Sequence, residues 1–447
     1  MTASRPISGR PHLYYAALCL LASLLLGGGT AQALWSDHVV QLIMLPAVFL
    51  GLRGLADRRV AVPARVLVVL LLLICAAQFL PISNPAHSPT GPSSALLPSP
   101  RFLSMDAGRS LAAATHAMTL AGFFLYVARM APSLQLRLLH IILMGVLGNL
   151  VVVLLQLFHA GGGDEPFLLP FEPKAGAFAN ANHLAAVFSM TVPIVAYLLL
   201  PRAAGWLGYL VCVGLCLLVL LAVDAMAGIA VVSGVGVFCL VWMRKGHDNG
   251  PWAAALRALL LLVMVIAYVP LVLPDLLGEE YRARIFATSW QVVEAWLPLG
   301  SGLGTFESVY TRFDADAPVR NTVVNHAHND VLELLIELGL LAVPLVALLL
   351  WIVWAPGARS PFADIARISL VACIMHTSVD YPLRTMAAGA LFAFLLGVRA
   401  TREVEERRLD GNGRESFVEP ALYLSPAGLD DLVGGTRQGR MEPVARR

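Results

Sequence analysis

The sequence of 447 residues has little charge: charged residues make up 13% of it, hydrophobic residues 58%, and mean hydropathy is +0.74. A soluble protein of this length could not bury so much apolar surface, so the composition excludes a soluble globular protein and indicates the lipid bilayer as its surroundings. Net charge is only +2, and two of the basic residues are lysines. Because the basic residues are scattered among connecting segments, we expect no nucleic-acid partner.

Cysteine is absent from the polar segments. All six cysteines fall inside apolar runs, and none has the spacing of a metal site. We interpret them as small buried hydrophobic residues and predict no disulfide framework. They are Cys19, Cys75, Cys212, Cys216, Cys239 and Cys373.

What the chain does contain is a series of apolar runs near the length of about 20 residues that a bilayer-spanning helix needs. We predict an all-α polytopic membrane domain over residues 1–400, with about twelve transmembrane helices and no internal repeat. The predicted spans are residues 12–29, 37–53, 64–81, 109–129, 137–159, 182–200, 205–223, 226–243, 253–274, 331–354, 365–379 and 384–399.

Arginine positions predict the orientation, because cytoplasmic loops of membrane proteins are enriched in basic residues. Basic residues fall in alternate connections, which predicts both termini in the cytoplasm. Residues 276–330 then form a large outer loop, and residues 401–447 a disordered cytoplasmic tail. Residues 1–33 also fit a cleavable signal peptide, which is the alternative to a first spanning helix. The predicted inner residues include Arg5, Arg10, Arg53, Arg58, Arg59, Arg65, Arg137, Arg202, Arg244, Lys245 and Arg359.

The large outer loop is predicted to be partly helical. Apolar residues recur near helical spacing from Tyr281 to Trp296, which indicates a helix along the membrane surface with Trp290 and Trp296 as interfacial anchors. A flexible turn is expected at 300–304, where three glycines alternate with Ser301 and Leu303 and could present backbone amides to an anion.

The most polar stretch at a predicted membrane boundary runs from Asn325 to Asp330 and includes His326 and His328. Ionisable groups are costly to hold there, so they are candidates for function. A histidine can accept the proton of an attacking hydroxyl. The alternatives are a metal site formed by His326, His328 and Asp330, or surface histidines at a helix cap. Glu333 and Glu337 share one helix face with Asn329, and we expect this face to point into the protein or a water-filled cavity.

Three further polar clusters accompany this stretch. Asn180, Asn182 and His183 begin the sixth span, with Lys174 just upstream, where a helix N-terminus favours anions or an amide serves as N-cap. The other two clusters are Arg282 with Arg284, suited to bidentate phosphate contacts, and His376, Asp380 and Arg384 at a predicted outer turn.

Four segments, spread over about residues 170–400, resemble motifs of the bacterial O-antigen ligase/polymerase superfamily in their order along the chain. The segments are Gly176–Ala185, Trp296–Phe306, His328-Asn329 followed after nine residues by Gly339, and His376–Arg384.

The resemblance implies a C-type membrane glycosyltransferase of the bacterial inner membrane that works on the periplasmic side, inverts the sugar and needs no metal or other cofactor. Its donor would be a glycan on undecaprenyl diphosphate, and its acceptor a sugar hydroxyl of lipid A core or of a growing polysaccharide. By motif, His328 would be the base or the orienting residue for the acceptor, and Arg284 would clamp the donor diphosphate. Substrate-binding roles would fall to Arg282, His326, Asn329, Asn180, Asn182, Lys174, Glu337 and Arg384.

Two positions depart from the family pattern. Met226 stands where members often carry an arginine, and Ala342 where ligases usually carry Gly, Thr or Tyr. Both differences weaken a ligase assignment more than membership of the superfamily. The rival interpretations are a proton-coupled transporter or polysaccharide export component, with a relay through Glu333, Glu337, His376 and Asp380, and a structural membrane scaffold.

Overall fold

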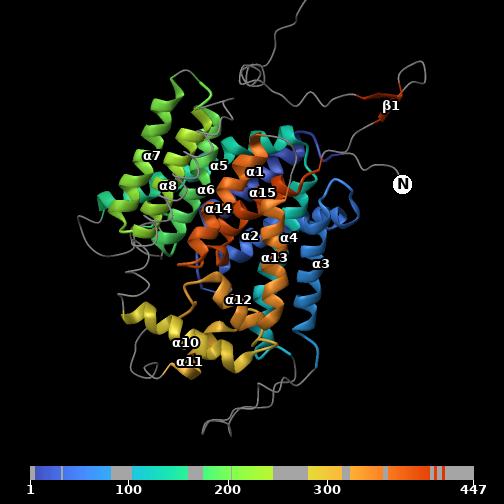
Figure 1. Ribbon diagram of the computed structural model, residues 1–447, viewed down its shortest axis with the longest axis vertical. Helices are drawn as coiled ribbons and strands as arrows, with labels where there is room; N and C mark the ends of the chain where they lie inside the picture. Colours follow the sequence, from blue (N-terminus) through green and yellow to red (C-terminus); the bar gives the residue numbers. More distant parts are fainter. Residues whose placement is uncertain are drawn as a thin grey trace, which may run out of the picture.

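The computed structural model describes residues 6–31, 34–81, 103–159, 175–202, 204–244, 280–314, 323–355, 361–402, 407–409 and 415–417. Most of the described chain is helical (Figure 1). Among the described residues, six helices are long and apolar enough to cross a membrane, and four more are shorter apolar helices. The prediction of a helical membrane protein is therefore supported.

Helices occur at eleven of the twelve predicted positions, counting the interrupted helix α12–α13 once; the ninth predicted span, 253–274, lies outside the described residues, so the number twelve stays a prediction. The helices at these positions are α1 (Arg10–Leu26), α2 (Trp35–Leu52), α3 (Val62–Ala77), α4 (Ala107–Ala128), α5 (Pro132–His159), α6 (Ala181–Leu199), α7 (Gly205–Ala222), α8 (Met226–Arg244), α12 (Asp330–Leu338), α13 (Ala342–Trp354), α14 (Pro361–Thr377) and α15 (Met386–Ala400). Short 3-10 turns are η1 (Arg53–Ala56), η6 (Gly339–Leu341) and η7 (Pro382–Arg384), and within the predicted tail β1 (Arg407–Leu409) pairs antiparallel with β2 (Glu415–Phe417).

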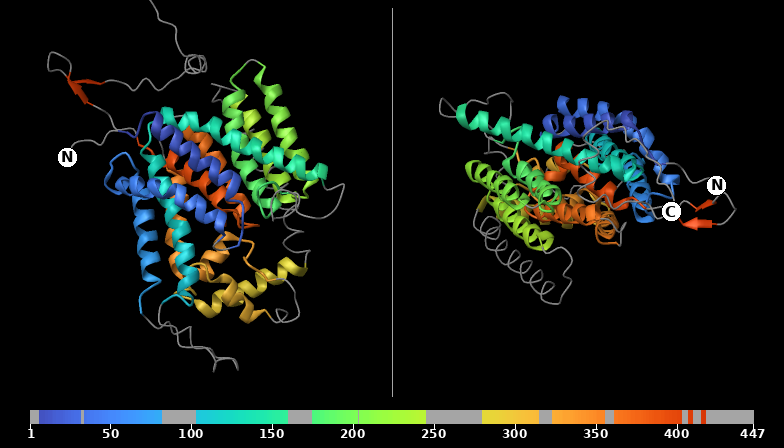
Figure 2. Two further views of the ribbon diagram at one scale, coloured as in Figure 1. Left: turned by 180° about the vertical axis from the view of Figure 1, so that it is seen from behind. Right: turned by 90° about the horizontal axis from the view of Figure 1, so that it is seen from above.

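Helix α15 lies at the centre of the bundle. All of its residues are buried, and it contacts α1, α4, α6 and α14 (Figure 2). It is apolar all round, as a fully buried helix should be, and its small residues Ala387, Ala388 and Gly389 let neighbouring helices approach closely. Helices α2, α5 and α7 instead keep large apolar side chains exposed, among them Phe49, Leu147 and Leu218, as expected of surfaces that face lipid.

The two ends of the bundle differ in character. At one end Val60 pairs with Thr401, which joins the start of α3 to the end of α15. The segments predicted to be cytoplasmic and rich in arginine meet there. At the other end Gly28 pairs with Phe178, which joins the end of α1 to the start of α6. Every element of the polar site described below belongs to this second end; which side of a membrane it faces stays a prediction.

A small unit of helices extends the second end of the bundle (Figure 1). It contains α10 (Glu280–Trp296) and α11 (Phe306–Phe313), which pack on α12 through a hydrophobic cluster that includes Ile285, Tyr310 and Ile336. The predicted loop helix is confirmed. The role predicted for Trp296 is wrong, because this side chain is only 4% exposed and belongs to the cluster, whereas Trp290 is 53% exposed.

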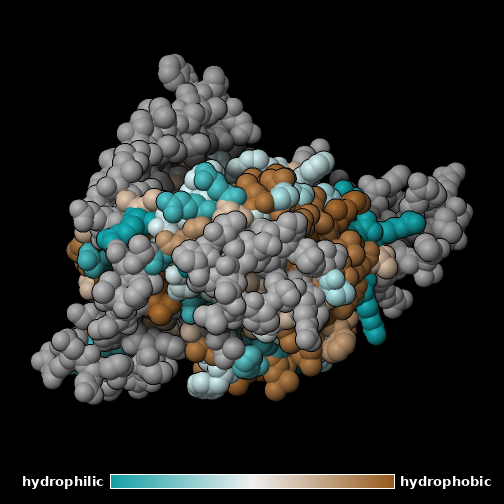
Figure 3. Space-filling model, turned by 90° about the horizontal axis from the view of Figure 1, so that it is seen from below, coloured by the Kyte–Doolittle hydropathy of each residue, from teal (hydrophilic) through white to brown (hydrophobic). Residues whose placement is uncertain are grey.

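Seen from this end of the molecule, hydrophilic residues gather on the upper left of the described surface and a hydrophobic patch lies on the right, with further hydrophilic residues at the far right edge (Figure 3).

The glycine turn at 300–304 is not a flexible, open loop. Its Ser301 and Gly302 amides donate to the carbonyl oxygens of Ile336 and Glu337, at 3.0 and 2.9 Å. These amides are therefore used to cap α12 and are not offered to an anion, contrary to the sequence-based expectation. The predicted span 331–354 is also interrupted here, because Gly339 has φ 55° and ψ −136° and ends α12. A side chain is poorly tolerated in this backbone conformation.

The glycine turn at 300–304 and the turn at Gly339 contact each other closely, and they belong to two of the four motifs. A Cβ added at Gly339 would lie 2.1 Å from the carbonyl oxygen of Pro298, and one added at Gly300 would lie 2.4 Å from that of Glu337. Only glycine fits at both contact points. The glycine-rich motif and the glycine of the His-Asn motif thus form one joint that fixes the angle between α12 and α13.

We expect Gly339→Ala to destabilise the protein by about 1–3 kcal/mol or more, because it adds both backbone strain and a steric clash. Gly214→Ala in α7 is the matched control, since nothing lies within 4 Å of a Cβ added there. The control should leave stability unchanged or slightly raised. Thermal unfolding of the two purified variants in detergent measures the difference, and equal melting temperatures would contradict the proposed joint.

Candidate active site

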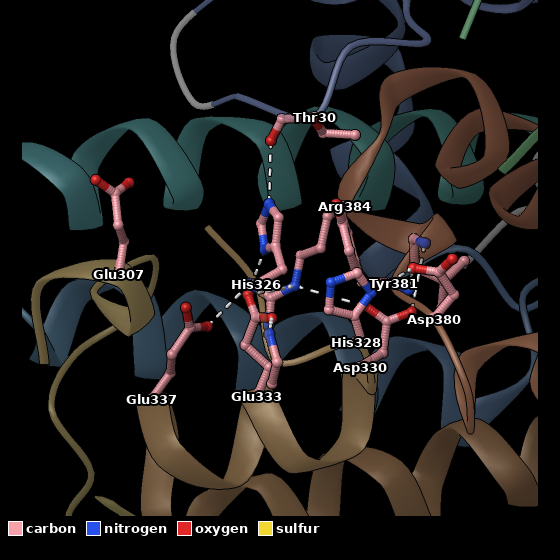
Figure 4. A network of polar contacts seen from close by, with 12 residues as sticks. Thr30, Glu307, His326, His328, Asp330, Glu333, Glu337, Asp380, Tyr381 and Arg384 are labelled. Carbon is pink, nitrogen blue, oxygen red and sulfur yellow. Dashed lines mark hydrogen bonds and ion pairs between the residues drawn. The ribbon is translucent and has the colours of Figure 1, made fainter. Parts of the chain in front are cut away.

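Arg384 is the centre of a buried charged network between η7 and α12 (Figure 4). Its Nη1 donates to Glu337 Oε2 at 2.9 Å, and its Nε lies 3.5 Å from Glu333 Oε1 and 3.6 Å from Asp330 Oδ1. The three carboxylates lie on one face of α12, and each is 5% exposed or less. They raise the pKa of the Arg384 guanidinium although burial lowers it. The predicted polar face of this helix is thus confirmed to point into the protein.

His326 links this network to the end of α1. Its Nδ1 is 2.8 Å from Glu333 Oε1 and its Nε2 is 3.0 Å from the Thr30 carbonyl oxygen. A carbonyl oxygen accepts only, and a carboxylate accepts when ionised, so both ring nitrogens carry protons and the ring is an imidazolium. Burial lowers the pKa of His326, but the Glu333 carboxylate outweighs burial and raises it. With both nitrogens donating, His326 cannot also ligate a metal in this arrangement.

Three imidazoles surround the ring of Tyr381. His326 stacks on it with centroids 4.1 Å apart, while His183 and His328 meet it edge-on at 4.7 and 5.1 Å. The three histidines come from different places in the sequence, namely the start of α6 and the segment before α12. Tyr381 therefore brings the first, third and fourth motifs of the sequence together.

The neighbouring Asp380 carboxylate receives the polar contacts of the same groups. Its Oδ1 is 3.4 Å from His328 Nδ1 and 3.5 Å from His183 Nε2, and Asn180 Nδ2 donates to its Oδ2 at 3.3 Å. Burial raises the pKa of Asp380, but the contacts with His183 and His328 outweigh it and hold this pKa well below its usual range. Asp380 is therefore an ionised group that orients imidazoles.

His328 differs from the other two histidines in being accessible. Its side chain is 21% exposed, against 0% for His183 and 6% for His326. Its Nδ1 is buried and faces Asp380, so the exposed side of the ring is the side of Nε2. The backbone of His328 has φ 50°, an uncommon value for a residue other than glycine. Such strain is concentrated at functional sites.

A cavity of about 220 Å³ adjoins the network. Apolar residues of α3, α4, α12 and α13 form most of its wall, including Leu71, Ala113, Leu338 and Leu345. Its polar wall consists of Arg384, His326, Asp330, Asp37, His38, Gln41, His116 and Thr30. The cavity therefore suits a molecule with an apolar part and a polar end.

Several buried polar atoms of residues that line this cavity lack a hydrogen-bond partner among the described residues. They are Arg384 Nη2, Asp330 Oδ1, Asp37 Oδ1 and His116 Nε2. Buried polar groups are normally paired, so a cluster of unpaired ones indicates a place for water or ligand.

The predicted site residues fall into three groups. His328, His326, Asn180, Asn329, Glu337 and Arg384 are brought together, although Asn180 and Asn329 also serve as N-caps of α6 and α12. Asn182 is half-buried in the first turn of α6. On α10, Arg282 is half-buried and Arg284 is exposed. Lys174 lies outside the described residues. Within the described chain the partners of His328 are Asp380 and Tyr381, so Arg284 is not in direct contact with it.

Sequence reasoning missed several members of the site. Tyr381 and His183 lie inside the motifs but were not predicted as site residues, and neither were Thr30, Asp37 and His116. A polar residue inside an apolar span was the one available signal for His116, because such residues seldom face lipid. Thr30 acts through its backbone carbonyl, which no side-chain pattern reveals.

We expect Arg384→Gln to cost about 3–5 kcal/mol of stability, because it leaves buried carboxylates without their cation. The double variant Arg384→Gln/Glu337→Gln should recover part of this loss. Arg137→Ala, which removes an exposed arginine of α5, should change stability by about 0.5 kcal/mol or less. Denaturant unfolding in detergent compares the three, and no recovery in the double variant would contradict the pairing of Arg384 with Glu337.

The imidazolium of His326 predicts a pH-dependent contribution to stability. Because its folded pKa is raised above about 6.5, its stabilisation is complete below that pH and is lost as pH rises through the folded value. The stability difference between the native chain and His326→Gln should therefore be largest in mildly acid solution and shrink towards alkaline pH. Melting temperatures across this range measure it; a difference that grows with pH would show that the ring is neutral.

Comparison of the sequence and structure with protein-family models, curated proteins and solved structures finds no match.

Proposed function

We propose that this chain is a membrane glycosyltransferase that moves a glycan from undecaprenyl diphosphate to a sugar hydroxyl on the periplasmic side of the inner membrane. The observation that carries the proposal is the pair formed by His328 and Asp380. It offers one accessible imidazole nitrogen beside a buried carboxylate. Tyr381 connects this pair to His326, which lines the cavity with apolar and charged walls.

In the proposed reaction the acceptor hydroxyl oxygen attacks the anomeric carbon of the donor sugar. The bond between that carbon and the phosphate oxygen breaks, undecaprenyl diphosphate leaves, and the hydroxyl proton passes to Nε2 of His328. Attack opposite the leaving group inverts the sugar carbon. The diphosphate is already a good leaving group, so positioning and charge stabilisation are the main requirements.

The pairing with Asp380 fits a base. A histidine whose Nδ1–H points at a carboxylate presents an unprotonated Nε2 to its substrate, and the carboxylate stabilises the imidazolium formed when a proton arrives. His183 shares Asp380 but is fully buried, and His326 already donates from both nitrogens. Of the three imidazoles around Tyr381, His328 is thus the one suited to take a proton.

A lipid-linked donor also fits the cavity next to the network. Its apolar wall matches a polyprenyl chain, and the unpaired Nη2 of Arg384 is a donor on its charged side. We assign contact with the diphosphate to Arg284 and Arg282 of α10, because arginine binds phosphate oxygens in a bidentate way. Arg284 is exposed on α10, which packs on α12, the helix that carries the three carboxylates.

A proton-coupled transporter is the weaker alternative. Its relay residues Glu333, Glu337, His376 and Asp380 are all buried and lie at one end of the bundle. Glu333 and Glu337 are engaged by Arg384, which opposes their use as proton carriers. A relay would have to continue to the opposite end of the bundle.

His328→Asn tests the base directly. Asparagine tolerates the left-handed backbone at this position but cannot accept the proton, so we expect transfer to fall about 10²–10⁴-fold with normal protein abundance and melting temperature. His159→Asn, at an exposed histidine that ends α5, is the matched control and should keep full activity. The assay follows the attachment of glycan by membranes supplied with lipid-linked donor. Normal transfer by His328→Asn would remove the central assignment.

The polysaccharide of a deletion strain separates the two proposed classes. Glycans with a single repeat would indicate a polymerase, and long chains accumulating on carrier lipid would indicate a ligase. An unchanged surface polysaccharide would contradict both.

A further inference from the structure

A second cavity lies between α5, α6 and α7, away from the polar site. Its volume is about 400 Å³, within the range of sites that hold small molecules. Both α5 and α7 pack against α6, which forms the floor of the groove. The lining positions on α5 recur at helical spacing, so the groove follows one face of that helix. The lining residues are His140, Leu143, Val146, Leu147, Leu150, Phe188, Thr191, Val192, Val195, Leu198, Leu199, Arg202, Cys212, Val213, Leu215 and Cys216.

This groove is apolar along its length and basic at one end. From His140 to Leu150 it follows α5 for about 15 Å at the rise of an α-helix, a length that suits part of an acyl chain. Arg202 lies just after the end of α6, and His140 is its counterpart on α5. Arg137 is exposed one turn before His140. Among the described residues that line the groove none is acidic, so the basic end has no carboxylate partner within it.

The groove is distinct from the candidate active site. Helix α6 begins beside Asp380, where Asn180 and His183 contribute to that site, and it ends at Leu199. The groove starts beyond this contact, at Phe188, and its basic residues lie past the other end of the helix. Arg202 is therefore close to the membrane surface opposite the one that the active site faces.

A plain interpretation of Arg202 is that it caps α6. Its Nη1 donates to the Leu198 carbonyl oxygen, as a basic residue at a helix C-terminus commonly does. This bond uses one N–H of the five that a guanidinium carries, and the side chain is exposed. Arg202 can thus cap the helix and still bind a phosphate with its other donors.

We propose that the groove between α5, α6 and α7 binds an anionic phospholipid of the leaflet opposite the active site, with an acyl chain along the groove and the headgroup phosphate at Arg202 and His140. The apolar lining selects the acyl chain, and the cationic end selects a net negative headgroup over a zwitterionic one. By the distribution of arginines this is the cytoplasmic leaflet.

Native mass spectrometry of the full chain in detergent tests the site with two probes of identical acyl chains, phosphatidylglycerol and phosphatidylethanolamine. We expect phosphatidylglycerol to bind about tenfold more tightly, because the cationic end of the groove repels the ammonium group that phosphatidylethanolamine carries beside its phosphate. Equal affinity for the two lipids would overturn the proposal.

Two variants locate the contact. Arg202→Gln keeps a donor for the Leu198 carbonyl oxygen but removes the charge, so it should abolish the preference while leaving the melting temperature unchanged. Cys212→Trp, a half-buried position on α7, should fill the groove and weaken both lipids. Arg53→Ala removes an exposed arginine that does not line the groove and should bind as the native chain does. A preference that persists in Arg202→Gln, or is lost equally in Arg53→Ala, would show that the lipid binds elsewhere.

Discussion

The pairing of Arg384 with the carboxylates of α12 is the constraint on which the rest of the site depends. Three acidic side chains and one guanidinium are buried where the chain enters an apolar environment, and each would be costly without the others. The sequence meets this constraint by placing Asp330, Glu333 and Glu337 on one helix face. The consequence is that α12 must lie against η7, and the segment before α12 is thereby brought to Tyr381.

The contact between the two glycine turns also restricts the position of α12. Gly300 and Gly339 hold the C-terminal end of α12 against the turn that follows α10, while Asn329 caps its start. With both ends fixed, the short helix cannot rotate its carboxylates towards lipid. His328 lies just before this helix, so its strained backbone is held by a rigid element.

The fold was largely predictable from the sequence, because long apolar runs separated by arginines and turns leave few other arrangements. The interruption at Gly339 escaped prediction, since hydropathy is continuous across it. The burial of Trp296 also escaped, because an aromatic residue on an amphipathic helix suits either a membrane interface or a protein core. Only the contact with Tyr310 and Ile336 decides between these.

Some residues of the site were predictable from the sequence, but their partners were not. A polar face on an apolar helix indicated that Glu333 and Glu337 point inward, yet nothing in the spacing identified Arg384, some 50 residues on, as their cation. Likewise His183 and His328 meet at Asp380 although they lie in distant segments. Such pairings arise from packing between helices, which periodicity within one helix does not encode. Through these pairings the separate motifs form one proposed site that contains an accessible base.

The most direct test of this account is a cryo-electron microscopy structure with an undecaprenyl-diphosphate glycan bound. We predict density for the diphosphate at α10, in contact with Arg284, and the first sugar carbon facing Nε2 of His328. A donor bound at the arginine-rich end of the bundle, or one whose sugar is turned away from His328, would contradict the central claim.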